Sequence, residues 1–257
     1  MAAPFDTGRP HPARVYDYLL GGKDNFAVDR AAAQAGLKVN PNAATAPLQN
    51  RAFLARTVKY LADAGVRQFL DIGTGLPTSP NVHEIAQGIA PESRIVYVDH
   101  DPIVLTHARA LLTSAPEGYT AYVDATLQEI KGEFWEHLDR DRPVALLLFA
   151  ILHFVDDDDE PYELVRRLMA ALPSGSYLVL SHITADFEPE EWGRFAAIMR
   201  AQGITSRLRD RAEVTRFFDG LDLVDPGVVP ILQWRPDATH PLTDAQAALY
   251  GGVARKP

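Results

Sequence analysis

The sequence predicts an α/β fold built on a mostly parallel β-sheet, for two reasons. From residue 66 onward, short apolar runs alternate with segments of helical periodicity. The run at 143–154 is apolar almost throughout, as is typical of a central parallel strand buried on both faces. The chain of 257 residues is long enough to bury a substantial core. Strands joined by crossover helices form right-handed βαβ units, so we expect helices on both faces of the sheet.

Five strands are expected in chain order, separated by helices that begin at recognisable caps. The strands are residues 66–73, 94–101, 119–125, 143–154 and 177–184. Ser79 is a candidate N-cap with Pro80 at the first helical position, and Asp101 with Pro102 repeats this arrangement. Apolar residues spaced three and four apart define the buried helix faces: Val82, Ile85, Ala86 and Ile89; Leu105, Ala108, Leu111 and Leu112; Leu164, Val165, Leu168, Met169 and Leu172.

The N-terminal part of the chain carries helical patterns instead of strands. Helices are expected at 12–20, 26–36 and 47–65, the first closed by Gly21-Gly22 and the third by Gly65. We therefore divide the chain into an N-terminal helical cover, residues 1–65, and a core, residues 66–257. The cover is expected to fold across the ligand-binding edge of the sheet.

Composition and charge disfavour several classes of partner. Lys and Arg number 25 against 34 Asp and Glu, and the net charge of −9 repels phosphate backbones and anionic lipid surfaces. The chain has no cysteine for a disulfide or a thiolate metal site, and no HxxxH spacing predicts a metal. No apolar run is long enough to span a membrane, and the N-terminus lacks the apolar stretch of a signal peptide. We expect a cytoplasmic protein that binds no metal, nucleic acid or membrane.

A glycine turn with an acidic neighbour, FLDIGTGLPTS at 69–79, ends the first strand. A dinucleotide would lay its pyrophosphate on backbone N–H groups at such a turn. Pro77 stands where the later glycine would be expected, and it has no N–H to donate. Asp71 would also repel the pyrophosphate, by about 1 kcal/mol in water and several times more when partly buried. The turn therefore disfavours a phosphate ligand.

S-adenosylmethionine would bring positive charge to this turn where a dinucleotide brings negative charge, because it carries an ammonium and a sulfonium but no phosphate. Acidic residues end three successive strands, at the edge where parallel sheets bind ligands. Asp71 can bind the ammonium, Asp99 the two ribose hydroxyls, and Asp124 the adenine amino group with the Ala125 N–H nearby. The neighbouring residues that we also assign to this cofactor are Gly73, Thr74, Gly75, His100 and Phe149.

Together these features resemble the class I (Rossmann-like) S-adenosylmethionine-dependent methyltransferases, over roughly residues 50–184. The opening PHPARVYDYLLGGKDNFAVDR and the ending YGGVARKP are similar to a more specific family, over almost the whole chain. That family was first catalogued as a domain of unknown function and later called S-adenosyl methyltransferase. The resemblance implies a seven-stranded sheet with a sixth strand at 223–229 and an antiparallel last strand at about 248–254.

The carboxylate of the methionine moiety needs a cation or N–H donors. Arg51 is the first candidate, because arginines on the helix before the first strand bind this carboxylate in some relatives of the class. A guanidinium can bind a carboxylate through two parallel hydrogen bonds. Arg14 is a second candidate, and Tyr18 with the Gly21-Gly22 turn can line the adenosine side. The alternatives are surface arginines and a simple helix stop.

His153 follows the fourth strand, where many methyltransferases present residues to the acceptor. Its imidazole can accept a proton from a hydroxyl or amine, which makes it the candidate catalytic residue; ordering of the loop is the alternative. His182, after the fifth strand, is a weaker candidate of the same kind. Aromatic residues of the last third are expected mainly in the core, with some walling the acceptor pocket: Trp192, Phe195, Phe217, Phe218 and Trp234.

The predicted function is an S-adenosyl-L-methionine-dependent methyltransferase that methylates a small molecule and releases S-adenosyl-L-homocysteine. In-line transfer depends on holding the acceptor against the methyl group and excluding water, which the cover helices would do. Two alternatives stay open. One is a non-catalytic module that binds S-adenosylmethionine as a sensor or partner-binding subunit. The other is a nicotinamide-dependent oxidoreductase, which Asp71 and Pro77 disfavour.

Overall fold

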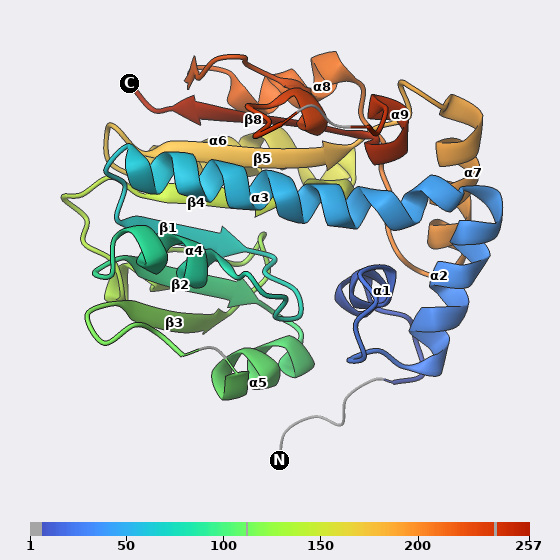
Figure 1. Ribbon diagram of the computed structural model, residues 1–257, viewed down its shortest axis with the longest axis horizontal. Coiled ribbons are helices and arrows are strands. Elements are labelled where there is room, and N and C mark those ends of the chain that lie inside the picture. The colour runs from blue at the N-terminus through green and yellow to red at the C-terminus, as the bar shows by residue number, and fades with distance from the viewer. Residues whose placement is uncertain (1–6, 112, 239–240) are drawn as a thin grey trace.

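A mostly parallel β-sheet forms the centre of the computed structural model, which describes residues 7–111, 113–238 and 241–257 (Figure 1). Its eight strands have the order β3-β2-β1-β4-β5-β8-β6, with β7 also paired to β8. The α/β prediction is confirmed. The five expected parallel strands are β1 (Gln68–Ile72), β2 (Arg94–Asp99), β3 (Tyr119–Asp124), β4 (Ala145–Phe149) and β5 (Tyr177–Ile183). The expected antiparallel last strand is β8 (Leu249–Arg255), beside β5.

Two parts of the sheet differ from the prediction. The expected sixth strand, 223–229, is replaced by two short strands, β6 (Asp222–Leu223) and β7 (Val229–Pro230), so the sheet has eight strands and not seven. Gly227, at φ +82°, turns the chain between them. β4 stops at residue 149 and not at 154, because Ala150 has a φ of +51° and the next residues form a 3-10 helix.

Alternate side chains of the strands enter two apolar cores, one on each face of the sheet. On one face, Leu147 packs with α3 (Thr45–Asp63) and α4 (Val82–Ile89). On the other face, Leu148 packs with α6 (Pro161–Ala171). Helices therefore cover both faces, as predicted.

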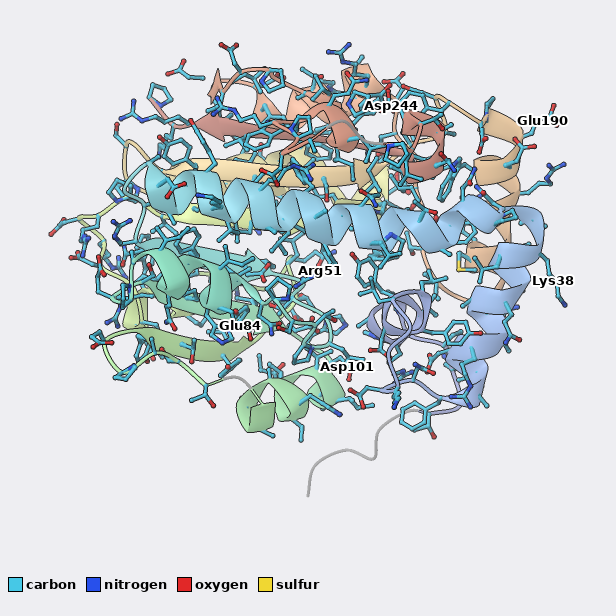
Figure 2. The ribbon with its side chains drawn as sticks, in the orientation of Figure 1. Lys38, Arg51, Glu84, Asp101, Glu190 and Asp244 are labelled. Atoms are coloured by element: carbon cyan, nitrogen blue, oxygen red, sulfur yellow. The ribbon has the colours of Figure 1, made fainter. Side chains whose placement is uncertain are left out.

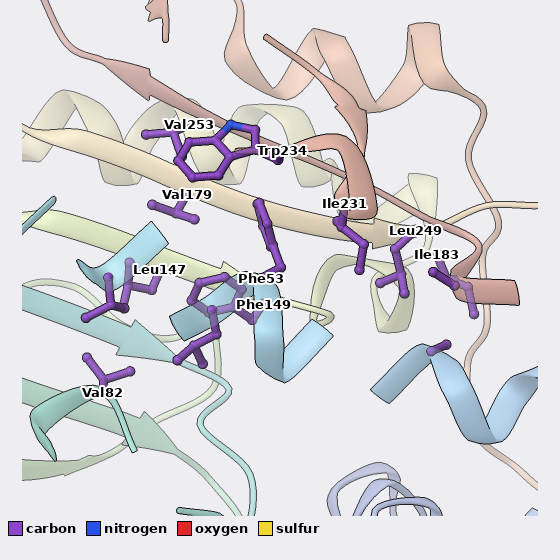
Figure 3. Packing of buried hydrophobic residues seen from close by; sticks show 14 of the residues in the cluster. Phe53, Val82, Leu147, Phe149, Val179, Ile183, Ile231, Trp234, Leu249 and Val253 are labelled. Carbon is purple, nitrogen blue, oxygen red and sulfur yellow. The ribbon is translucent and has the colours of Figure 1, made fainter. Parts of the chain in front are cut away.

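The long helix α3 crosses the first face over the centre of the sheet (Figure 1). Its Phe53 ring lies edge-on to Phe149 and Trp234, with ring centroids 5.9 and 5.7 Å away (Figure 3). Gly251 of β8 permits this approach, because a Cβ there would lie 2.7 Å from the Phe53 ring. The aromatic residues expected in the core are buried: Trp192, Phe195, Phe217, Phe218 and Trp234.

The start of α4 differs from the prediction. The helix begins at Val82 with Asn81 as its N-cap, and not at Ser79-Pro80. The Asn81 backbone N–H donates to the Glu84 carboxylate in a capping box. This reciprocal bonding to the first helical turn favours Asn81 over the serine two residues earlier.

The helix α5 (Pro102–Leu111) lies beside β3 and begins at the predicted cap. The Asp101 Oδ1 atom accepts a hydrogen bond from the Ile103 N–H at 2.8 Å. Leu112, expected on its apolar face, lies outside the described residues.

The first two helices, α1 (Pro12–Leu19) and α2 (Ala27–Val39), lie beyond the carboxyl ends of the parallel strands (Figure 1). There α2 packs against α7 (Pro189–Ala201). The shorter helices are α8 (Arg211–Thr215) and α9 (Asp244–Ala247). The carboxyl ends of the strands are therefore covered by helices from the N-terminal part of the chain and from the segment after β5.

Candidate active site

A cavity lies at the carboxyl ends of β1, β2 and β4, with α1 and α3 as further walls; we call it the strand-end cavity. Parallel strands present their carboxyl ends at one edge of a sheet, which is why distant residues meet here. The residues assigned from the sequence that line it are Arg51, Asp71, Gly73, Thr74, Gly75, Asp99, His100 and Phe149. Lining residues that the sequence did not indicate include His11, Tyr16, Asn50 and Ala150.

Asp124 and Ala125, assigned to the adenine, do not line this cavity. Asp124 is exposed at the end of β3, in register with Asp99 of β2. The Ala125 N–H donates to the Asp99 backbone oxygen at 3.2 Å and so continues the sheet ladder. Among the described residues, the walls of the strand-end cavity therefore include the end of β2 but not the end of β3.

Two assigned residues of α1 also lie elsewhere. Arg14 is buried, and its Nε lies 3.1 Å from an Asp29 carboxylate oxygen, so it ties α1 to α2. The Tyr18 hydroxyl accepts a hydrogen bond from Gln34 at 3.0 Å on the exposed side. Tyr16 is the tyrosine of α1 that lines the cavity.

The Asp71 carboxylate is buried at the end of β1, with the side chain 6% exposed. Burial raises its pKa to about 7, while the Arg51 guanidinium lowers the pKa and Asp99 raises it. Desolvation disfavours the charged form of a carboxyl, and a nearby cation restores it. Asp71 is therefore suited to a cationic group of a ligand.

Asp99 is hydrogen-bonded to the glycine turn and to the residue two positions after it. The Gly75 N–H donates to Asp99 Oδ2 at 2.9 Å, and the Asp101 N–H donates to Oδ1 at 3.0 Å. An ionised carboxylate has further lone pairs, so Asp99 can still accept from a ligand diol. At Gly73, with φ +73°, a Cβ would lie 2.5 Å from Ile151, so a larger residue there would clash.

The glycine turn does not lead directly into a helix. Residues 76–81 separate Gly75 from the first residue of α4, Val82. The helix N-terminus that would hold a pyrophosphate is thus displaced from the turn. This geometry agrees with the expectation that the ligand carries no phosphate here.

Arg51, labelled in Figure 2, extends from α3 to the loop after β1. Its Nη2 donates to the backbone oxygen of Thr78 at 2.6 Å and also to that of Pro80. These bonds fix one nitrogen of the guanidinium, and the other donors remain for a ligand carboxylate.

A second cavity adjoins the first, and we call it the apolar cavity. Its walls come from α1, α3, α7, the 3-10 helix Leu152–Phe154 and the ends of β5 and β8. Its apolar lining includes Val15, Leu19, Trp192, Phe195, Met199 and Leu249. The residues that line both cavities, and so form their boundary, are Pro12, Tyr16, Asn50, Ala150 and Phe154.

A chain of hydrogen bonds fixes this boundary. The Ala150 N–H donates to Ser181 Oγ at 3.0 Å, and Ser181 Oγ donates to Asn50 Oδ1 at 2.6 Å. Asn50 Nδ2 donates to the Tyr16 hydroxyl at 3.1 Å, which in turn donates to the Pro47 oxygen at 3.1 Å. The chain links α1, α3, β5 and the segment after β4 at the place where the cavities meet.

His153 lines the apolar cavity and not the strand-end cavity. Its side chain is buried, and its Nδ1 has no hydrogen-bond partner among the described residues. Burial lowers the pKa of His153 to about 3, and the Arg209 guanidinium lowers it further. The imidazole is therefore neutral at physiological pH.

His182 has a structural environment. Its Nδ1 lies 2.7 Å from the Ile183 oxygen, and its Nε2 lies 2.9 Å from Arg209 Nη1, so both ring nitrogens are engaged. The fully buried Arg209 also donates to the backbone oxygens of Leu152 and Val155. Arg209 thereby anchors the segment that carries His153.

Membrane-spanning helices and clustered metal ligands were sought over the same residues. None of the helices in the described ranges is long and apolar enough to cross a bilayer. Within those ranges, no three His, Cys, Asp or Glu side chains are arranged to hold a metal ion.

Comparisons with known proteins identify the family. The sequence matches the family described as S-adenosyl methyltransferase over residues 1–257. This chain belongs to that family. It is accordingly an S-adenosylmethionine-dependent methyltransferase, as predicted. No curated protein matches the chain.

Two solved structures resemble nearly the whole chain. A DUF574 family protein from Streptomyces avermitilis MA-4680 is 51% identical, with a TM-score of 0.95 over 98% of this chain and 99% of that chain. A candidate methyltransferase from Thermobifida fusca YX is 39% identical, with a TM-score of 0.90 over 98% and 96%. The plantazolicin methyltransferase BamL, solved with S-adenosylhomocysteine, is 10% identical and has a TM-score of 0.56 over 95% and 96%, a similarity of fold alone.

Proposed function

We propose that the methyltransferase binds the methionine and ribose parts of S-adenosylmethionine in the strand-end cavity and a small-molecule acceptor in the apolar cavity. The observation that carries this proposal is the shared boundary: a cavity bearing buried acids has lining residues in common with one lined mainly by apolar side chains. A sulfonium at the boundary would have its charged amino-acid end among the acids and its methyl group toward the apolar side.

The side chains of the strand-end cavity suggest a role for each charged part of the cofactor. Asp71 would bind the ammonium, because a cation restores its ionised form. Arg51 would bind the carboxylate, and Asp99 the ribose hydroxyls. Gly73 and Gly75 would allow the backbone to approach the methionine chain. His100, with an exposed side chain, would lie at the ribose edge.

The reaction is an in-line displacement. A lone pair on the acceptor oxygen or nitrogen forms a bond to the methyl carbon, and the carbon–sulfur pair stays on sulfur, giving S-adenosylhomocysteine. The acceptor proton becomes strongly acidic as the new bond forms, so a weak base can take it. His153, neutral in the apolar cavity, is the proposed first receiver of that proton before it passes to water.

Water exclusion is the proposed role of the N-terminal cover, residues 1–65. His11 Nδ1 lies 3.1 Å from Asp101 Oδ2, and Asp24 lies 3.5 Å from His107, so polar contacts tie α1 and the segment after it to α5. We further propose a cytoplasmic protein whose acceptor is a free small molecule and not a nucleic acid, which the net charge of −9 supports.

Calorimetric titration tests the cofactor assignment. The native protein should bind S-adenosylmethionine and S-adenosylhomocysteine, and Asp71→Ala should weaken both by roughly 30-fold, since a hydrogen bond to a charged group contributes about 2 kcal/mol. Asp124→Ala, altering an exposed strand-end acid outside the cavity, is the matched control and should have a smaller effect. Unchanged affinity in the Asp71 variant, or binding of NAD(P) in place of S-adenosylmethionine, would contradict the proposal.

A further inference from the structure

The apolar cavity also restricts the chemistry of the acceptor. We propose that the acceptor is an uncharged, largely apolar small molecule that presents one hydroxyl or N–H group at the boundary between the two cavities. This inference rests on the proposed function, because it takes the strand-end cavity as the site of the methyl donor.

The lining of the apolar cavity carries the argument. Among the described residues that line it, none is Asp, Glu, Lys or Arg, whereas the adjoining strand-end cavity contains Arg51, Asp71 and Asp99. An ammonium, carboxylate or phosphate placed in the apolar cavity would lose its water and find no opposite charge, which is strongly unfavourable. Amino acids, nucleotides and sugar phosphates are therefore poor acceptors for this site.

The side chains that line the cavity favour a compact ligand with considerable apolar surface. Trp192, Phe195 and Phe154 offer flat faces, and Met199 offers an adaptable one. Helices α1, α3 and α7 each contribute side chains to its walls.

Few polar groups are available to orient the acceptor. Tyr16 and Asn50 reach the cavity at the boundary, but they already bond to each other and to Pro47 and Ser181. Ser206 is a further polar lining residue. Two lining groups are different, because the His153 Nδ1 atom and the Trp192 Nε1–H group are buried without a hydrogen-bond partner among the described residues. One polar group on an otherwise apolar acceptor matches this supply, and a polyhydroxylated acceptor would leave most of its hydroxyls without partners.

The test uses a neutral fluorescent probe, N-phenyl-1-naphthylamine, titrated into the native protein saturated with S-adenosylhomocysteine. We expect saturable binding and a rise in probe fluorescence. Met199→Gln, which puts a polar group of similar size in the wall, should weaken probe binding by about tenfold. Met199→Leu keeps the wall apolar and should change it less than about twofold. Both variants should keep the native affinity for S-adenosylhomocysteine, which also shows that they fold.

A matched pair of competitors distinguishes the effect of ligand charge on binding from the effect of ring shape. 2-Naphthol and 6-hydroxynaphthalene-2-sulfonate share the rings and the hydroxyl and differ by one fixed charge. We expect 2-naphthol to displace the probe at a concentration at least about tenfold lower than the sulfonate. Equal or better displacement by the sulfonate would overturn the proposal, as would a protein that binds S-adenosylhomocysteine but not the probe. If S-adenosylhomocysteine failed to bind, the cofactor assignment would fail, and the same titration without it would still decide the acceptor class.

Discussion

The strand-end cavity and the apolar cavity share a boundary and the helices α1 and α3, yet their other walls come from different parts of the chain. The acids Asp71 and Asp99 of the first stand at strand ends, so the topology of the sheet places them. The second is formed by α1, α3, α7 and the segments after β4 and β5, so the packing of helices determines its shape. Under the proposed function, the sheet fixes the position of the cofactor and the helices around it select the acceptor.

Burial shifts the pKa of a titratable group in each cavity, and the two shifts have opposite directions. It raises the pKa of Asp71 to about 7 and lowers the pKa of His153 to about 3. In each case desolvation favours the neutral form. The strand-end cavity therefore gains a charge when a cation enters, whereas the apolar cavity stays neutral over the physiological range.

The largest expected effect concerns the support of the apolar cavity. Arg209→Met removes a buried guanidinium that bonds to His182 and to two backbone oxygens, so it should lower the free energy of unfolding by about 3 kcal/mol. Urea denaturation measures this. Arg207→Met is the control: Arg207 is 38% exposed and pairs with Asp157 and Glu213, so its loss should cost less than about 1 kcal/mol.

The same Arg209 variant tests whether the two cavities are independent. Where it still folds, we expect weaker binding of the naphthylamine probe and nearly unchanged binding of S-adenosylhomocysteine, because Arg209 anchors the His153 segment and not the strand-end acids. Equal loss of both ligands would mean that the cavities form one cooperative unit.

The second effect is the pH dependence of cofactor binding. In the free protein Asp71 is mostly protonated below pH 7, and a bound ammonium favours its ionised form. Binding should therefore release a proton below pH 7, and affinity should rise about tenfold from pH 5.5 to 7. Calorimetry in buffers of different ionisation enthalpy measures the released proton. Asp71→Asn should flatten the dependence, and an unchanged slope in that variant would assign the proton to another group.

Local patterns predicted most of the fold. Alternation, helix periodicity and caps such as Asp101 depend on neighbours in the sequence, and they located five parallel strands and most helices. The errors arose where two local rules competed. Ser79-Pro80 has the composition of a helix start, but Asn81 forms the capping box with Glu84. At 223–229, the turn at Gly227 divided what was expected to be one strand.

The candidate site was predicted where strand ends define it. Asp71 and Asp99 could be found because each stands near the carboxyl end of a recognisable strand. The contact between Asn50 and Ser181 joins residues 131 positions apart, and Arg209 meets His182 across a separation of 27. No local spacing in the sequence predicts such pairs. The residues that form the boundary between the cavities, and the contacts of Arg209 that support the apolar cavity, were therefore not predicted.

Tyr16 was not assigned to the site from the sequence, although its helical spacing is a signal for it. Pro12, Val15, Tyr16 and Leu19 are spaced as one helical face, and all four line the apolar cavity. Tyr18 lies two residues from Tyr16, so it points about 200° away around the helix and reaches neither cavity. The periodicity therefore favoured Tyr16 over Tyr18 as a lining residue.

The smallest expected effect distinguishes these two tyrosines at the boundary. Tyr16→Phe removes a hydroxyl that accepts from Asn50 and donates to Pro47, which should destabilise the fold by about 1 kcal/mol. Because Tyr16 lines both cavities, the variant should weaken S-adenosylhomocysteine and the probe together, each by less than about fivefold. Tyr18→Phe loses only an exposed bond from Gln34 and should leave both affinities unchanged. If only one ligand responded to Tyr16→Phe, the boundary would belong to that cavity alone, and the shared wall between donor and acceptor would have to be placed elsewhere.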